Sequence, residues 1–127
     1  MNNKTPYWYI ATAYTNFTGG PIEAFQVSAK ATAYFLKRGI HAYGPIAHSH
    51  PVAVHGELDK YDHEFWMWVD QPFMEGAQGL IVVATDEDIE KSSGIQHEIE
   101  MFKLAEKPVL QMDPWDIPEL REHYLPT

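Results

Sequence analysis

Short apolar runs alternate along this chain with longer segments of helical periodicity, and this order restricts the possible folds. Residues 79–85 (GLIVVAT) predict a strand that is buried on both faces. Three further strands are expected at residues 7–13, 40–43 and 108–112. Helices between them give the pattern β-α-β-α-β-α-β, which requires parallel strands and right-handed crossovers. The sequence therefore predicts an α/β fold, a doubly wound Rossmann- or flavodoxin-like parallel sheet of four to five strands flanked by helices, with ligands bound beyond the carboxyl ends of the strands.

The segments between the strands differ in how clearly they predict structure. A helix is expected to begin at Pro21, and Asp62 is expected to cap a second helix that Pro72 kinks or splits. By contrast, residues 44–60 are rich in His and Pro and predict a long irregular loop, of a length that is often functional. Residues 86–90 predict a solvated acidic turn.

Composition excludes several classes of partner and site. With 127 residues, 45% of them hydrophobic, the chain is expected to form one domain, residues 1–127, with a substantial core. A net charge of −9 argues against a nucleic-acid polymer or an anionic membrane as partner. The absence of cysteine excludes disulfides, thiolate metal sites and a cysteine nucleophile. Because no apolar run approaches membrane-spanning length, a cytoplasmic location is expected.

The most informative chemical feature is a glutamate near the start of the last helix. Ser92 is expected to cap this helix, whose buried stripe carries Ile95 and Phe102. At about 100° per residue, Glu98 lies only about 40° from Phe102 and about 60° from Ile95. Glu98 therefore borders the buried face close to the positive end of the helix, where its charge can be tuned for catalysis. The alternative is a glutamate that only supports the helix dipole.

Three motifs, in this order, carry a resemblance to a known family. They are the strand residues 9–12 (YIAT), the loop residues 44–50 (GPIAHSH) and the helix start at residues 92–98, with the pattern Ser-x-Gly-x-x-x-Glu. In these motifs the chain resembles the nucleoside 2-deoxyribosyltransferase family, in particular a small uncharacterised branch, with nucleoside 5′-monophosphate N-glycosidases as relatives. The resemblance extends from about residue 7 to about residue 110.

This resemblance implies the roles of three catalytic residues. Glu98, four positions after Gly94, matches the family's nucleophilic glutamate, and Asp70 matches the aspartate that handles a proton near the leaving base. Tyr9 matches the tyrosine that positions the nucleophile. Ser92 stands where nucleoside transferases carry an aspartate for the sugar 5′-hydroxyl and where monophosphate hydrolases carry a serine. A serine hydroxyl at a helix N-terminus suits a phosphate, which a carboxylate would repel.

Two positions depart from the family's pattern. Gln78 stands where an acidic residue is common, just before the third strand. Pro72, two residues after Asp70, is unusual inside the matching helix. The alternative that Asp70 only caps a second short helix therefore stays open.

Other candidates would bind substrate around these groups. A nucleobase needs a flat apolar surface, which Tyr14 is expected to supply. Trp66 is expected in the core, and Trp68 at a subunit contact or in solvent. The expected substrate-binding residues are Thr12, Tyr14, Gly19, Gly20, His48, His50, Ser92 and Gly94.

Histidines are concentrated in the predicted loop and just after it. The residues that could supply nitrogen and oxygen ligands to zinc or another divalent ion are His48, His50, His55, His63, Asp59 and Asp62. No pair has the i, i+4 spacing of the zinc hydrolases, and the resemblance implies no metal, so neither a metal nor a cofactor is expected. A protonated His48 or His50 would instead offset phosphate charge. A loop packed by its own prolines and imidazoles is the alternative.

The expected reaction is cleavage of an N-glycosidic bond through a covalent sugar intermediate on Glu98, resolved by water or by a second base. Hydrolysis of a nucleoside 5′-monophosphate is favoured over base exchange. A non-catalytic nucleotide-binding module on the same fold and a metal-dependent hydrolase are the alternatives. A homo-oligomer, a dimer or tetramer, is expected because residues 111–127 form an apolar tail with Trp115 and Tyr124. In the resembling family, moreover, a neighbouring subunit completes the site.

Overall fold

Four short strands pair in parallel to form one sheet in the order β2-β1-β3-β4. The computed structural model describes residues 5–125 of the chain. Its strands are β1 (Trp8–Ala11), β2 (Ala42–Tyr43), β3 (Gly79–Val83) and β4 (Val109–Met112). The chain adds β2 on one side of β1 and then crosses to add β3 on the other, so the strand order reverses at β1. This arrangement confirms the predicted parallel α/β fold, with strands that lie inside the predicted ranges but are shorter.

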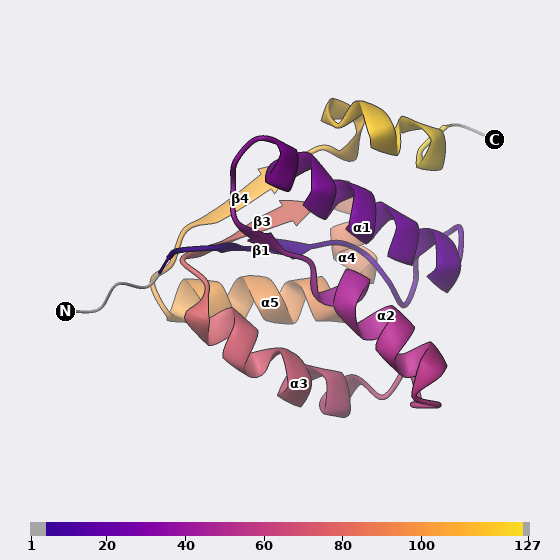
Figure 1. Cartoon of the computed structure of the whole chain (residues 1–127), viewed down its shortest axis with the longest axis horizontal. Helices are drawn as coiled ribbons and strands as arrows, with labels where there is room; N and C mark the ends of the chain where they lie inside the picture. Colours follow the sequence, from indigo (N-terminus) through magenta and orange to yellow (C-terminus); the bar gives the residue numbers. More distant parts are fainter. Residues whose placement is uncertain (1–4, 126–127) are drawn as a thin grey trace.

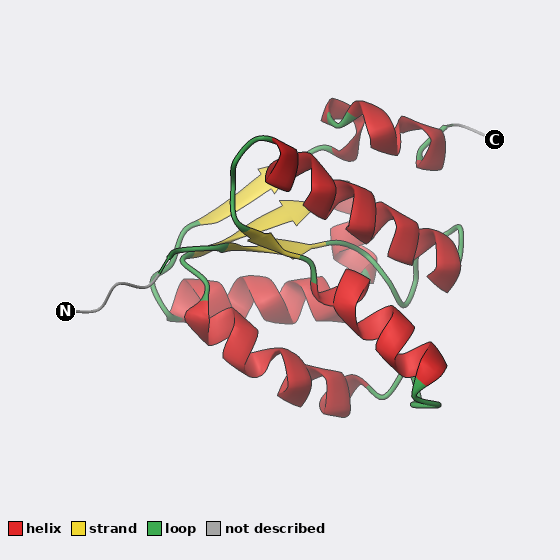
Figure 2. Ribbon diagram, viewed as in Figure 1, coloured by secondary structure: helices red, strands yellow, loops and turns green. Residues whose placement is uncertain are grey.

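Helices cover both faces of the sheet. The helices are α1 (Pro21–Lys37), α2 (Pro45–His55), α3 (His63–Gly76), α4 (Asp86–Lys91) and α5 (Ser93–Leu104), and the 3₁₀ turns are η1 (Pro114–Asp116) and η2 (Pro118–His123). In Figure 1, α3 and α5 run side by side below the strands, while α1 lies on the other side with the C-terminal turns next to it. Figure 2 shows the same layers, with the strands enclosed by helices.

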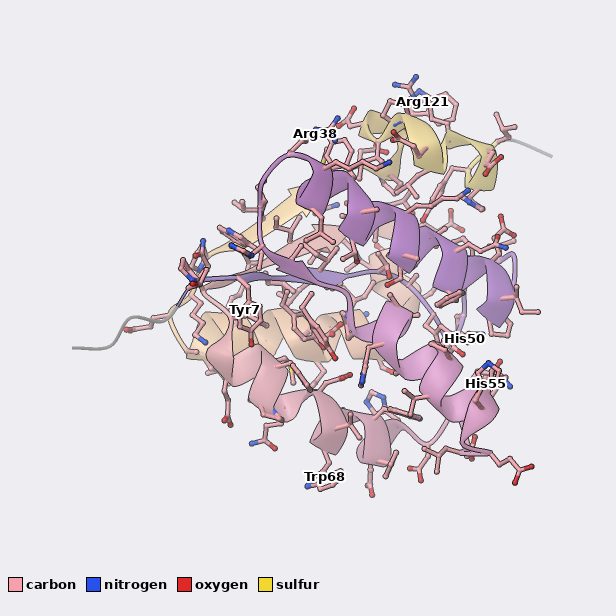
Figure 3. The ribbon with its side chains drawn as sticks, in the orientation of Figure 1. Tyr7, Arg38, His50, His55, Trp68 and Arg121 are labelled. Atoms are coloured by element: carbon pink, nitrogen blue, oxygen red, sulfur yellow. The ribbon has the colours of Figure 1, made fainter. Side chains whose placement is uncertain are left out.

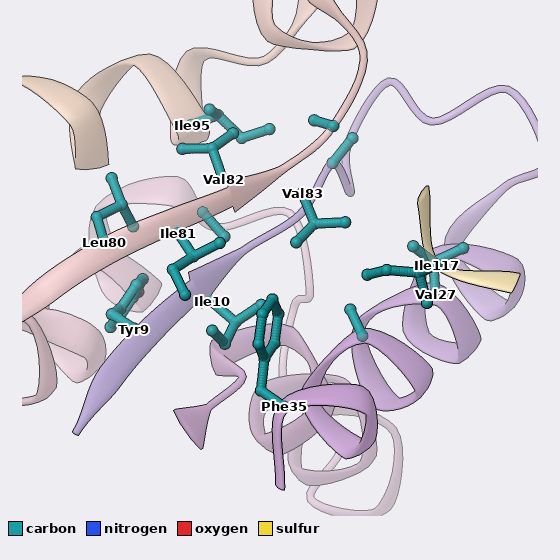
Figure 4. Packing of buried hydrophobic residues seen from close by; sticks show 14 of the residues in the cluster. Tyr9, Ile10, Val27, Phe35, Leu80, Ile81, Val82, Val83, Ile95 and Ile117 are labelled. Carbon is teal, nitrogen blue, oxygen red and sulfur yellow. The ribbon is translucent and has the colours of Figure 1, made fainter. Parts of the chain in front are cut away.

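Alternate residues of β3 face the two helical layers. Leu80 and Val82 point toward Ile95 of α5 (Figure 4). Ile81 and Val83 point toward the opposite layer, formed by α1 (Figure 4). All residues of β3 are buried, as the apolar run predicts for a strand covered on both faces.

The prediction of a long irregular loop over residues 44–60 is wrong, because most of this segment forms α2. Pro45 occupies the first helical turn, where a proline removes no needed hydrogen bond. The backbone N–H of Ala47, which has no partner inside the helix, donates to Oγ of the buried Ser28 on α1 at 3.0 Å. His50 and Ala53 are buried as well. Packing against α1 therefore makes a helix from a segment whose composition favours a loop.

Two further local predictions are corrected. Pro72 lies inside α3 but does not split it, and Asp62 caps the helix as expected, with Oδ1 accepting from Phe65 N at 3.3 Å. Residues 86–91 form the short helix α4 rather than a turn. Thr85 caps α4 by accepting from Asp88 N at 3.1 Å, and the acidic first turn complements the positive end of the helix.

The C-terminal tail packs on its own domain. Ile117 and Leu120 are completely buried, and η2 contacts α1. Tyr124 is mostly enclosed, with its ring 5.9 Å from that of Phe17, whereas Trp115 stays 45% exposed. The apolar tail is thus largely explained without a partner, and it no longer carries the expectation of an oligomer. Within residues 5–125, no helix has the length and apolar character needed to cross a membrane.

Candidate functional site

A cavity of about 850 Å³, including its open mouth, lies beyond the carboxyl end of β1. Its walls come from α2, α3, the connection between these helices and the first turns of α5. The site therefore forms where parallel α/β sheets bind their ligands, beside the strand at which the order reverses.

Tyr9, Asp70 and Glu98 line this cavity together, although they come from three different elements. Tyr9 is completely buried on β1, while Asp70 of α3 and Glu98 of α5 are partly buried. Within the described residues, the Tyr9 hydroxyl and Oδ1 of Asp70 are buried without a hydrogen bond of standard geometry. Buried polar atoms without partners are uncommon, and they concentrate where a protein binds or transforms a ligand.

The electrostatics of these three groups differ from those of ordinary surface residues. Burial raises the pKa of Glu98 to about 8, an effect to which the Asp70 charge adds and which the Tyr9 hydroxyl opposes. Burial likewise raises the pKa of Asp70 to about 6, again opposed by the Tyr9 hydroxyl. The pKa of Tyr9 is raised well above its usual range by burial and by the two carboxyl groups. Two carboxyl groups with separated pKa values are the arrangement that acid–base catalysis requires.

The local structure excludes the simpler explanations of both carboxyl groups. Asp70 lies in the interior of the continuous helix α3, so it is not the cap of a second helix. Glu98 lies in the second turn of α5, where Ile95 and Phe102 are buried and Oγ of Ser92 accepts from Ile95 N at 3.1 Å, as predicted. Support of the helix dipole alone would not require Glu98 to face Asp70 inside a cavity.

Tyr14 and His50 form a hydrogen-bonded pair in another wall of the cavity. The Tyr14 hydroxyl lies 2.7 Å from Nδ1 of His50, and the His50 ring stacks on Phe25 at 5.0 Å between centroids. Burial, together with the charge of Lys60, lowers the pKa of His50, and burial raises the pKa of Tyr14 to about 12. The pair is therefore neutral near pH 7, which argues against the expectation that a protonated His50 offsets phosphate charge.

Hydrogen-bond donors gather near the start of α5. Ser92, Ser93 and Gly94 line the cavity beside the N-terminus of this helix. Thr12, which is 3% exposed, also lines the cavity, and its hydroxyl has no partner among the described residues. Hydroxyl groups and free backbone N–H groups at a helix N-terminus can bind an anionic or hydroxyl-bearing ligand.

Three of the predicted substrate-binding residues are not brought to the cavity. Gly19 and Gly20 precede α1, where Gly20 has a φ of 88° that favours glycine, and neither lines the cavity. His48 lies on α2 but contacts the rings of Tyr43 and Phe73, each 6.0 Å away between centroids. These residues support the fold around the site rather than the site itself.

Other lining residues were missed or misplaced by the sequence prediction. Trp66 was expected in the core but lines the cavity, with Nε1 donating to the Asp59 carbonyl at 2.9 Å. Helical spacing from Asp70 was an available signal, since Trp66 and Met74 are one turn before and after it. Trp68 is 69% exposed and points away from the molecule, as expected (Figure 3). The remaining lining residues that were not predicted to bind substrate are Pro45, Ile46, Ala53, Lys60, Tyr61, His63, Met67, Ser93, Ile95 and His97.

Comparison with protein families matches residues 6–114 to a domain of unknown function, DUF1937. The chain belongs to this family. The DUF1937 match contains the whole sheet and every residue that lines the cavity, whereas η2 lies outside it. Among curated proteins no match is found. The family description names no activity, so the chemistry must be argued from the site.

The histidines of this DUF1937 domain do not assemble into a metal centre in the described part of the chain. No three His, Cys, Asp or Glu side chains of residues 5–125 converge as metal ligands. His48 faces the aromatic cluster described above, and His55 lies at the far end of α2 from the sheet (Figure 3). The alternative of a metal-dependent hydrolase built on this segment therefore has no geometric support.

Proposed function

We propose that this protein cleaves the N-glycosidic bond of a nucleoside or of its 5′-monophosphate through a covalent intermediate on Glu98. The observation that carries the proposal is the meeting of Tyr9, Asp70 and Glu98 in one cavity, with both carboxyl pKa values raised and unequal. The resemblance to nucleoside 2-deoxyribosyltransferases, which implies catalytic roles for these three residues, supports it.

In the first step, a carboxylate oxygen of Glu98 attacks C1′ of the sugar. The bond between C1′ and the base nitrogen breaks, and its electron pair leaves with the base, which takes a proton from Asp70. The products of this step are the free base and a sugar ester of Glu98. The Tyr9 hydroxyl lies against both carboxyl groups, where it can hold Glu98 in line with C1′.

In the second step, the ester is opened. Asp70, now ionised, removes a proton from water, the resulting hydroxide attacks C1′, and Glu98 leaves as a carboxylate. A second base in place of water would give base exchange. Between pH 6 and pH 8 the pair holds one proton, which the higher pKa of Glu98 places mainly on that group. The reactive form is therefore the minor one, in which the proton has moved to Asp70 and Glu98 is ionised.

The rest of the cavity fits the two ends of such a substrate. The hydroxyl of Tyr14 is engaged by His50, so its ring is held as a flat surface against which a base can stack. Ser92 and the N-terminus of α5 suit a phosphate, which favours hydrolysis of a 5′-monophosphate over base exchange.

The direct test is chromatography of the products released from nucleosides and their monophosphates, each with and without an added free base. Release of free base that is lost in Glu98→Gln supports the proposal. Glu100→Gln is the matched control, since Glu100 lies on the same helix but is exposed. Binding of nucleotides without any base release would favour the alternative of a non-catalytic binding module.

We also propose that copies of the chain associate through the α3–α5 face. A groove there is lined by Met67, Trp68 and Met101, and it shares Met67 and His97 with the cavity. Trp68 is 69% exposed, although an aromatic side chain of this size gains from burial. Light scattering at micromolar concentration should give a mass above that of one chain, and Trp68→Gln should lower it.

A further inference from the structure

The cavity contains one cationic side chain, and that cation is not paired with a carboxylate. Lys60 is the only Lys or Arg among the lining residues, and it is partly buried in the connection between α2 and α3. No described carboxylate lies within salt-bridge distance of Lys60. By contrast, Lys30 pairs with Glu122, and Lys91 pairs with Glu87.

The acidic residues close to Lys60 in the sequence accept hydrogen bonds from backbone N–H groups instead of pairing with the lysine. Oδ1 of Asp59 accepts from Tyr61 N at 2.9 Å, which shapes the connection. Oδ1 of Asp62 accepts from Phe65 N at 3.3 Å, which caps α3. The connection therefore presents the Lys60 charge without neutralising it.

The ammonium group lies beside the aromatic part of the cavity. Nζ of Lys60 is 5.3 Å from the centroid of the Tyr61 ring, and this ring is 6.2 Å from that of Tyr14. The charge of Lys60 also acts on His50, whose pKa is lowered by burial and by this lysine. Lys60 thus lines the cavity next to Tyr61, and its charge acts on His50 in the same cavity.

The net charge of the chain makes such a cation significant. At −9, the protein repels anions, and Asp70 and Glu98 lie in the cavity itself. The hydroxyl groups of Thr12, Ser92 and Ser93 can donate hydrogen bonds to an anion but carry no charge. A phosphate bound in this cavity would therefore be stabilised by a positive side chain, and Lys60 is in a position to supply that charge.

We propose that Lys60 binds the phosphate of the substrate and makes the cavity selective for nucleoside phosphates over nucleosides. The inference rests on the proposed function for the nucleoside part of the ligand. Lys60 is a specificity residue here, with Ser92 and the start of α5 supplying the uncharged donors. A lysine that only anchors the connection by its contact with Tyr61 would instead affect stability and leave selectivity unchanged.

Binding is measured by calorimetry in the full chain carrying Glu98→Gln, so that turnover does not interfere. The probes are the common 2′-deoxynucleoside 5′-monophosphates and the matching nucleosides.

Lys60→Gln should lower the affinity ratio of monophosphate to nucleoside by about tenfold, because a charge-assisted contact is lost. Lys60→Arg should retain the ratio. Lys103→Gln is the matched control, since Lys103 is an exposed lysine of α5 that does not line the cavity. Monophosphate binding should also weaken with salt, and less so in Lys60→Gln.

Three results would overturn the inference. One is that Lys60→Gln, with an unchanged melting temperature, loses affinity equally for nucleosides and monophosphates. The others are that its affinity ratio of monophosphate to nucleoside is unchanged, or that the protein binds none of the probes. Base release is measured separately on the parent protein. If no base is released but monophosphate binding depends on Lys60, the glycosidase proposal fails and the phosphate assignment stands. If nucleosides and monophosphates are cleaved equally and Lys60→Gln affects neither, the phosphate assignment fails and the glycosidase proposal stands.

Discussion

Two groups of ionisable side chains in this protein are at least partly buried, and they differ in whether their members satisfy one another's hydrogen bonds. Between α1 and η2, Nδ1 of His123 donates to Glu23 at 2.9 Å, while its Nε2 accepts from Lys30 at 2.9 Å. Lys30 also pairs with Glu122. Donors and acceptors alternate through this cluster of Glu23, Lys30, Glu122 and His123, which we call the tail clamp, and every member has a partner.

The cavity cluster of Tyr9, Asp70 and Glu98 contains two acids and a phenol but no cation. Its carboxyl pKa values are raised, and polar atoms of Tyr9 and Asp70 lack partners among residues 5–125. A cluster selected only for stability would be arranged as the tail clamp is. Compared with the tail clamp, burying these three groups together lowers the stability of the folded protein. Such a loss of stability is typical of a functional site.

The largest effect is expected for Glu98→Gln. Loss of the nucleophile should reduce turnover by about 10⁴-fold or more. The same change should raise stability relative to the parent from about pH 5 upward, with the full gain reached near pH 8. A carboxyl group whose folded pKa of about 8 exceeds its unfolded value binds more protons when folded, so its contribution to stability falls as pH rises between those values. A gain on the order of 1 kcal/mol, about 4 °C in melting temperature, is expected at pH 9. A less stable Glu98→Gln protein with full activity would remove the distinction between the two clusters.

Asp70→Asn should slow base release by about 10²- to 10⁴-fold, because it removes the group that exchanges the proton. Asp70 is not a helix cap, so little stability should be lost. Single-turnover rates and thermal melts of the variant separate these effects. A variant that loses stability and keeps its rate would place Asp70 with the structural groups.

The pH dependence of kcat/KM should be bell-shaped, with limits near 6 and 8. Below the lower limit both carboxyl groups are protonated and no nucleophile remains. Above the upper limit both are ionised and no acid remains, so activity falls about tenfold per pH unit on either side. A profile that stays flat from pH 5 to pH 9 would contradict the shared proton.

Ser92→Asp should lower the kcat/KM ratio of monophosphate to nucleoside by about tenfold, because the carboxylate repels a phosphate but can accept from a 5′-hydroxyl. Aspartate caps a helix about as well as serine, so the melting temperature should stay unchanged. The measurement is kcat/KM for matched nucleoside and monophosphate pairs, in the parent protein and in Ser92→Asp. An unchanged ratio would leave Ser92 with its capping role alone.

The smallest effect on activity is expected in the tail clamp. His123→Ala leaves Glu23 and Lys30 without their shared partner, and the His123 side chain is only 6% exposed. The free energy of unfolding should fall by about 2 kcal/mol, measured by urea denaturation, while kcat/KM stays near that of the parent. Glu122→Gln is the control, and its loss of stability should be much smaller because Glu122 is exposed and its ion pair is screened by water. A large loss of activity in His123→Ala would show that the clamp also serves the site.

The fold class and the position of Glu98 on its helix could both be predicted from the amino-acid sequence. Strand–helix alternation is a local property, because the periodicity of apolar residues follows from the geometry of each element. The same periodicity placed Glu98 at the border of a buried stripe, and the cap at Ser92 needed only its own helix. In these cases neighbours in the sequence are also neighbours in space.

Only the tertiary structure decided the helix over residues 45–55 and the composition of the cavity. That helix depends on Ser28 and on packing against α1, neither of which its own residues encode. Asp70 and Glu98 are brought together by the packing of α3 against α5, and Lys60 reaches the same cavity through a connection without periodicity. The raised pKa values follow from this burial, because desolvation is set by whatever surrounds a side chain and not by its place in the chain.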